Sequence, residues 1–105
     1  MVVRTWRGQT TRDNRDAYVR HVTQNVFPKL KSISGHRGAY LLQKESKDRV
    51  EFLVLTMWES MQAVRAFAGK NVDQAVVEPE ARAVLAEFDV FVNHYELVHD
   101  SVGPK

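Results

Sequence analysis

Several residues of this chain could take part in chemistry, although none belongs to a strong catalytic motif. His94 alternates with Val90 and Val92, so its imidazole is expected to be partly buried, and a histidine near neutral pKa is a suitable base for a phenol. The alternative is a structural histidine with its hydrogen bonds satisfied. Trp58 can line a pocket and donate its indole N–H to a ligand oxygen, or it can pack at a strand end. We therefore predict His94 and Trp58 as the catalytic candidates.

Other residues are suited to holding a small aromatic or anionic molecule. Arg4 and Trp6 share one face of an expected strand, where a guanidinium group can bind an anion. Tyr95 and Asn93 share a face of the last expected strand, and His36 opens the second strand, either at a pocket mouth or in water. Ordinary surface or interface contacts are the alternative for each. The predicted binding residues are Trp6, Arg4, Phe67, Tyr95, Asn93 and His36.

Metal and cofactor sites find little support in the sequence. The histidines and acids show none of the usual ligand spacings, and the chain has no cysteine, so it offers no thiolate ligand or nucleophile. His21 lies off the apolar stripe of its expected helix, and both it and His99 are expected to face solvent. A glycine-rich phosphate loop is also absent from the sequence. We predict no metal site and no cofactor.

Composition excludes several classes of partner. The basic residues are scattered and the net charge is only +2, which argues against nucleic-acid binding. No apolar run approaches the roughly 20 residues that span a bilayer. We therefore expect a cytoplasmic protein whose ligand is a small apolar or aromatic molecule.

The chemistry must be positioned by a small α+β fold. Residues 50–58 read as a strand that is apolar on both faces after Glu51, so both faces must be covered. Ser60 can cap the short helix that follows, and Gly69 can end it. Further strands are expected at 2–9, 36–44 and 89–98, with helices at 13–30 and 75–88. This order predicts a ferredoxin-like βαββαβ domain over residues 1–98, with an antiparallel four-stranded sheet and a frayed tail at 99–105.

Within this sheet we expect the first and third strands to be parallel neighbours, which would place Trp6 and Trp58 at the same end. The helices of such a fold cover one face only. The other face keeps apolar residues from every strand, and an apolar patch of that size marks an association surface. We expect a homodimer that packs sheet against sheet. A monomer with an apolar sheet face is the alternative, and the pattern leaves open which face meets the partner.

The chain also resembles the antibiotic biosynthesis monooxygenase domain family. The resemblance covers nearly the whole chain and is densest at the T-x-W-E-S run from Thr56 to Ser60 and at the closing H-Y-E of residues 94–96. It implies a dimeric α/β barrel with a ligand pocket between the helices and the sheet. It also implies a small cofactor-independent monooxygenase, an oxidoreductase acting on an aromatic or quinone-like compound. A non-catalytic homodimer that binds a small molecule is the alternative.

The haem-degrading branch of that family can be tested residue by residue. That branch has a tryptophan nine residues after the tryptophan of T-x-W-E-S and a haem-ligating histidine ten residues further on. Phe67 and Val77 stand at these positions here, and Trp6 stands near the position of an asparagine on the first strand. Valine has no lone pair to offer to iron. These departures argue against haem degradation.

Overall fold

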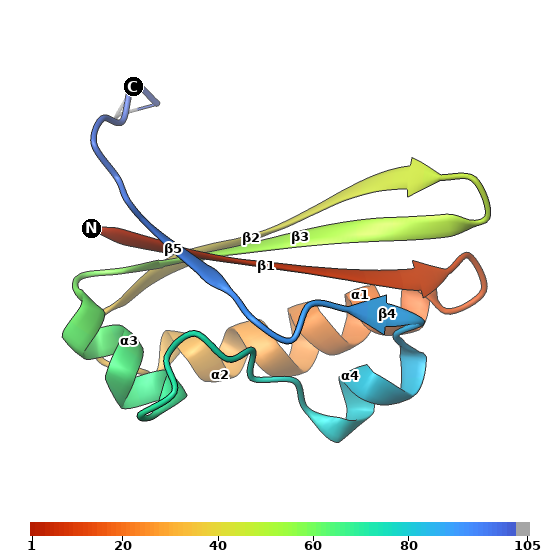
Figure 1. Cartoon of the computed structure of the whole chain (residues 1–105), viewed down its shortest axis with the longest axis horizontal. Helices are drawn as coiled ribbons and strands as arrows, with labels where there is room; N and C mark the ends of the chain where they lie inside the picture. The colour runs from red at the N-terminus through yellow and green to blue at the C-terminus, as the bar shows by residue number, and fades with distance from the viewer. Residues whose placement is uncertain (103–105) are drawn as a thin grey trace.

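A single antiparallel sheet organises the molecule, and the computed structural model describes it over residues 1–102 (Figure 1). Strand β1 (Val2–Thr11) pairs with β3 (Arg49–Trp58), and β3 pairs in turn with β2 (His36–Ser46). The other edge of β1 is shared by two short strands, β4 (Glu87–Phe88) and β5 (Asn93–Glu96). The α+β class and the ferredoxin-like arrangement are therefore confirmed.

The expected parallel pairing of the first and third strands is wrong. Strands β1 and β3 are antiparallel, with Val2 opposite Trp58 and Trp6 opposite Val54. The β2–β3 hairpin reverses the chain, so β3 must run against both β2 and β1. Trp6 and Trp58 consequently lie at different levels of the sheet instead of together at one end.

The last strand is interrupted where one long strand was expected. Between β4 and β5 the chain leaves β1 and bonds to the loop before α4: Ala75 N donates to Val90 O over 2.8 Å, and Val92 N donates to Asp73 O over 2.7 Å. Competition from this loop explains the break, because a backbone group can pair with only one of the two edges.

The first helical run is continuous but changes its winding. It comprises α1 (Arg15–His21), a π-helical segment η1 (Val22–Val26) and α2 (Phe27–Lys31). Phe27 N–H bonds to Val22 O, a π-type i to i+5 bond. Pro28, which has no N–H to donate, follows directly, so the wider turn lets the helix continue through it. His21 is buried at the end of α1, and the expectation that it faces solvent is wrong.

The two later helices are short. Helix α3 (Met61–Ala68) starts at Ser60, whose hydroxyl oxygen accepts a bond from Ala63 N over 3.2 Å. Helix α4 (Pro79–Val84) occupies only the middle of the expected span 75–88. Its start is delayed because residues 73–75 are held by residues 90–92, and Pro79 is well suited to a first helical turn.

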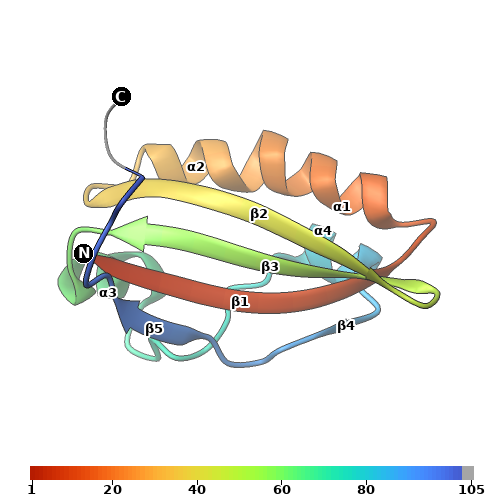
Figure 2. The same ribbon diagram turned by 90° about the horizontal axis from the view of Figure 1, so that it is seen from above.

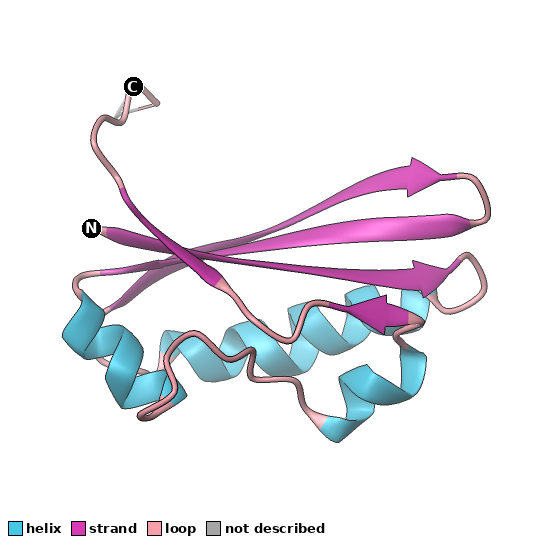
Figure 3. Ribbon diagram, viewed as in Figure 1, coloured by secondary structure: helices cyan, strands magenta, loops and turns pink. Residues whose placement is uncertain are grey.

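All of the helices lie on one side of the sheet (Figures 1–3). Two apolar clusters fill the space between these layers: Tyr18, Val22, Val50, Phe52 and Ala81 form one, and Leu30, Trp58 and Val64 form the other. The opposite sheet face, called the outer face below, carries Val3, Tyr40, Leu42, Leu53, Leu55, Met57 and Tyr95. Tyr40 and Tyr95 are each 58% exposed there.

Within residues 1–102, no helix has the length and apolar character that crossing a bilayer requires. The tail expected at 99–105 is described only as far as residue 102, and the part after it lies outside the described residues.

The Ser60 cap gives a test of how α3 is held. Replacing Ser60 by Ala removes the side-chain acceptor of Ala63 N, and we expect the free energy of unfolding to fall by about 1 kcal/mol in urea titrations. Ser34→Ala, at an exposed turn residue, is the matched control and should leave stability unchanged. Equal effects of both substitutions would contradict a role for the cap.

Candidate functional site

A cavity of about 280 Å³ lies between the inner face of the sheet and the helices. Its wall is mostly apolar, with a few charged groups set into it. The polar and aromatic lining residues are Arg4, Trp6, Tyr18, His21, Phe27, Lys29, Thr56, Phe67 and Glu78. Aliphatic side chains from β3, η1, α2, α4 and the neighbouring loops complete the wall.

Arg4 is the most unusual of these residues, because its charged side chain is buried with 5% exposure. Nη1 donates to Val72 O over 2.6 Å, and Nη2 donates to Gln74 O over 3.0 Å. The guanidinium carbon lies 5.7 Å from the centre of the Phe67 ring. Arg4 thus ties the loop at 72–74 to the sheet while facing the cavity.

The charge of Arg4 has no close counter-ion in the described part of the chain. None of the ion pairs within residues 1–102 includes Arg4. Burial lowers the pKa of Arg4, and the charge of Asp73 opposes that shift. The guanidinium stays protonated, because the ordinary pKa of arginine lies far above neutral pH. A buried cation bound only to neutral groups is costly, and it has N–H donors to spare. An anionic oxygen of a ligand in the cavity would balance this charge and accept hydrogen bonds from these donors.

His94 holds Arg4 from behind. Its Nε2 lies 3.0 Å from Arg4 Nη1, and its Nδ1 lies 3.5 Å from Asp73 Oδ1. Burial and the Arg4 charge lower the pKa of His94, and Asp73 partly opposes them. The ring is therefore neutral at neutral pH, with Nε2 accepting from Arg4 and the Nδ1 proton directed at Asp73. His94 does not line the cavity itself.

Trp58 lies one layer behind the cavity wall. It is fully buried, and its Nε1 donates to Thr56 Oγ1 over 2.9 Å. Its ring stacks on Phe67 at a centroid distance of 5.2 Å. Thr56 and Phe67 both line the cavity, so Trp58 supports two wall residues without lining the wall. Catalytic roles for Trp58 and His94 stay predictions.

Trp6 lines the cavity directly, as expected for a binding residue. Its indole N–H is occupied by Asp89 O at 2.7 Å, so the ring offers an apolar surface. The ring lies over Gly8, where an added Cβ would come within 2.8 Å of a Trp6 ring carbon. Gly8 therefore makes room for this orientation of the indole.

The structure does not bring the remaining predicted residues to the cavity. Asn93 and Tyr95 pair with Thr5 and Val3, which places them on the outer face. The His36 ring packs edge-on against the Trp58 ring, with 5.0 Å between the ring centroids, and burial lowers the pKa of His36. Of the predicted residues only Trp6, Arg4 and Phe67 line the cavity, and binding roles for the other three stay predictions.

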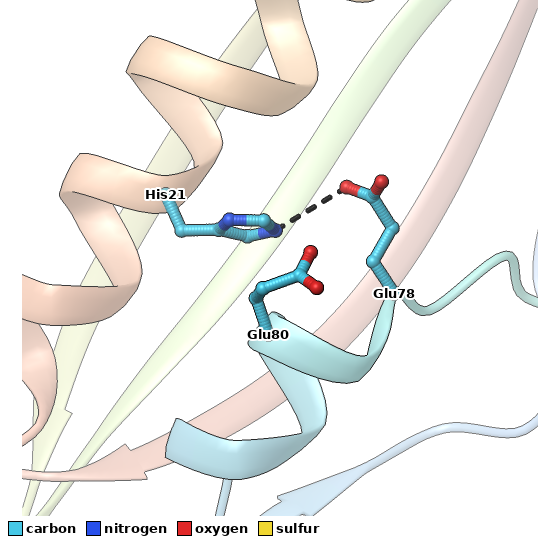
Figure 4. A group of neighbouring side chains, drawn as sticks. All are labelled: His21, Glu78 and Glu80. Carbon is cyan, nitrogen blue, oxygen red and sulfur yellow. Dashed lines mark ion pairs between the residues drawn. The ribbon is translucent and has the colours of Figure 1, made fainter.

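Sequence reasoning missed a charged group on the helical wall. His21 Nε2 lies 3.3 Å from Glu78 Oε1, and Lys29 Nζ lies 3.0 Å from Glu78 Oε2. Figure 4 shows His21 pointing from α1 toward Glu78 and Glu80. The sequence contained a signal, because His21 follows Tyr18 by three positions and so shares its helix face.

Comparison with known proteins agrees with this architecture. A sequence model of the family described as antibiotic biosynthesis monooxygenase matches residues 1–83. The chain belongs to this family. Curated proteins offer no sequence match.

Solved structures of antibiotic biosynthesis monooxygenase proteins share the fold. One from Bacillus cereus is 16% identical with a TM-score of 0.64, and 95% of each chain is covered. One from Nitrosomonas europaea is 14% identical with a TM-score of 0.66, covering 94% of this chain and all of its own. The haem degrader MhuD from Mycobacterium tuberculosis, with two haems bound, is 19% identical with a TM-score of 0.61, covering 95% of this chain and 98% of its own.

The lowered pKa values of His94 and His36 predict how stability depends on pH. The ordinary pKa of histidine is 6.5, so at lower pH these two histidines take up protons more readily in the unfolded chain than in the folded one. The folded state should therefore lose stability as the pH falls through 6.5. Urea midpoints measured between pH 7.5 and 5 check this. His94→Gln should reduce the loss, whereas His99→Gln in the exposed tail should not; identical profiles for both would contradict the assignment.

Proposed function

We propose that this protein is a small cytoplasmic oxygenase that acts on an aromatic or quinone-like compound without a tightly bound cofactor. The observation that carries the proposal is the apolar cavity with the buried guanidinium of Arg4 in its wall. Membership of the antibiotic biosynthesis monooxygenase family supports the class of reaction.

The chemistry requires an electron-rich ligand that ionises. A phenolic compound gives its hydroxyl proton to solvent as it binds, and Arg4 stabilises the resulting anionic oxygen; solvent returns a proton when the water product forms. The anion then reacts with O₂: one oxygen atom enters the compound, the other leaves as water, and the compound itself supplies all four electrons. No external reductant is needed, and the apolar wall keeps bulk water away from the anion.

The side chains near Arg4 divide this work among them. Trp6 and Phe67 offer aromatic surfaces to a flat ligand. His94 acts as a positioning residue, because it contacts Arg4 and does not reach the cavity. Trp58 keeps the Phe67 ring in place through stacking.

The cavity wall does not support haem degradation. Val77, which stands where the resemblance expects a haem-ligating histidine, lines the cavity with an aliphatic side chain. A reaction that uses the substrate's own electrons fits this wall better.

The second candidate function is that of a non-catalytic binding protein. The same apolar cavity supports it, since a buried cation can hold an aromatic anion without any later step. The two functions differ in one observable, the consumption of O₂.

Arg4→Gln tests the role of the guanidinium. A panel of phenols, naphthols and hydroxylated three-ring aromatics is screened with an oxygen electrode. For any compound that is turned over, we expect the substitution to lower kcat by about 100-fold, because one electrostatic stabiliser is lost. Arg20→Gln, at an exposed position of α1 outside the cavity wall, is the control and should retain activity.

A second substitution guards against a folding defect in the Arg4 variant. Val77→Trp fills the cavity and should abolish both binding and O₂ consumption, whereas Val90→Trp, at an exposed position outside it, should change neither. Ligand binding without O₂ consumption would favour the binding protein. Full activity in both Arg4→Gln and Val77→Trp would refute this site.

We also propose that a second copy of the chain covers the outer face. Leu53, Leu55 and Met57 of β3 point away from the helices, so nothing in residues 1–102 covers them with a second layer. Exposed Tyr40 and Tyr95 extend the same apolar surface. Packing two such faces together removes this surface from water.

Leu55→Lys should convert the dimer to a monomer, because it places a charge at the centre of the apolar face. Sedimentation velocity distinguishes the 12.1 kDa chain from its dimer. The control is Gln62→Lys on the exposed side of α3, which should remain dimeric. A wild-type chain that sediments as a monomer would contradict the proposal.

A further inference from the structure

We propose that His21, Glu78 and Glu80 form a binding site for a divalent first-row transition-metal cation on the helical wall of the cavity. One donor atom from each residue lies within 4.8 Å of the other two. The histidine comes from α1, and the glutamates come from the start of α4 and the residue before it (Figure 4). This site does not depend on the oxygenase proposal, since it shares no residue with Arg4 and its contacts.

The state of His21 is the observation that points to a ligand. Its side chain is 7% exposed, and its Nε2 makes no hydrogen bond within residues 1–102. Nε2 approaches Glu78 Oε1 to 3.3 Å, but the two atoms do not have hydrogen-bond geometry. A buried polar atom without a hydrogen bond is rare in proteins, and here it lies close to two carboxylates. A cation placed among the three groups would satisfy it.

The other ring nitrogen of His21 also fits this role. Asn25 Nδ2 lies 3.3 Å from His21 Nδ1. Half a turn of the Asn25 amide presents its oxygen to Nδ1, which can then carry the proton and donate. That bond would leave the Nε2 lone pair free to bind a metal. Metal-binding histidines usually donate their other ring N–H to a neighbouring oxygen in this way.

Assembling the site requires modest movement. Zinc-ligand bonds of about 2.1 Å in a tetrahedron separate donor atoms by about 3.4 Å, so donors as far apart as these must close in. Glu80 is exposed, so turning its side chain toward the site meets little packing. Lys29 Nζ, 3.0 Å from Glu78, must give way, and its side chain is 67% exposed. These adjustments indicate a weaker site than a preformed one.

The three donor groups indicate which metals would bind and where the bound ion would lie. One imidazole with carboxylates suits Zn²⁺, Mn²⁺, Fe²⁺ or Co²⁺. Three protein donors leave a coordination position open, as in catalytic zinc sites. Because His21 and Glu78 line the cavity, a cation held by them would lie beside the space where a small molecule would bind.

The test uses metal ions alone with the full chain, purified without a histidine tag. Isothermal titration with ZnCl₂ should give one equivalent per chain, and CoCl₂ should produce visible absorption bands of bound cobalt. Glu78→Gln and Glu80→Gln should each raise the Kd by about tenfold or more, because each removes a charged donor from a partly exposed position without disturbing the core.

His99→Gln is the matched control, since His99 lies in the exposed tail and belongs to no such cluster among the described residues. It should leave the Kd unchanged. Absence of saturable binding of either metal would overturn the proposal, and so would unchanged affinity in both glutamate variants. A loss of binding in His99→Gln alone would place the metal on the tail and overturn it equally.

Discussion

The hydrogen bonds of Arg4 to the carbonyl oxygens of Val72 and Gln74 are the contacts on which the arrangement around the cavity depends. They bring the loop between α3 and α4 against the central strand. The same loop then bonds to residues 90–92 and interrupts the final strand. One buried side chain thus connects strand, loop and sheet edge, and its charge is what gives an otherwise apolar cavity its chemical character.

Much of the fold was predictable because it depends on local patterns. The double-sided apolar strand at 50–58 and the Ser60 cap were recognisable from the order of residues alone, and both were confirmed. The direction of β3 relative to β1 was predicted wrongly, because it is decided by the β2–β3 hairpin and not by the pattern within either strand. The break between β4 and β5 depends on hydrogen bonds from Ala75 to Val90, which no local pattern in either segment reveals.

The site was less predictable for a physical reason. A strand pattern tells which residues share a face, and this correctly paired Arg4 with Trp6 at the cavity. It cannot tell which face the helices cover, so Asn93 and Tyr95 were grouped with residues that lie on the other side of the sheet. The burial of His21 was missed because only apolar residues were used to define the buried face of the helix. A buried histidine does not stand out in such a pattern. Glu78 lies directly before α4, inside the span that was expected to be helical, and nothing in that pattern showed that it would meet His21.

The π-helical segment at Val22–Val26 has a consequence for how this helix could change. A π turn holds one residue more than the α-helical turn it replaces, so it behaves like a single insertion absorbed within the helix. The residues on its two sides are thereby held in different angular registers: Tyr18 and His21 face inward before it, and Leu30 faces inward after it. Rewinding the segment as a regular α-helix with every residue retained would rotate one half of the helix by about 100° relative to the other, whereas deleting one residue would restore even winding and leave both halves in place. The bulge is therefore what allows a single helix to present an imidazole to the cavity at one end and a leucine to the core at the other.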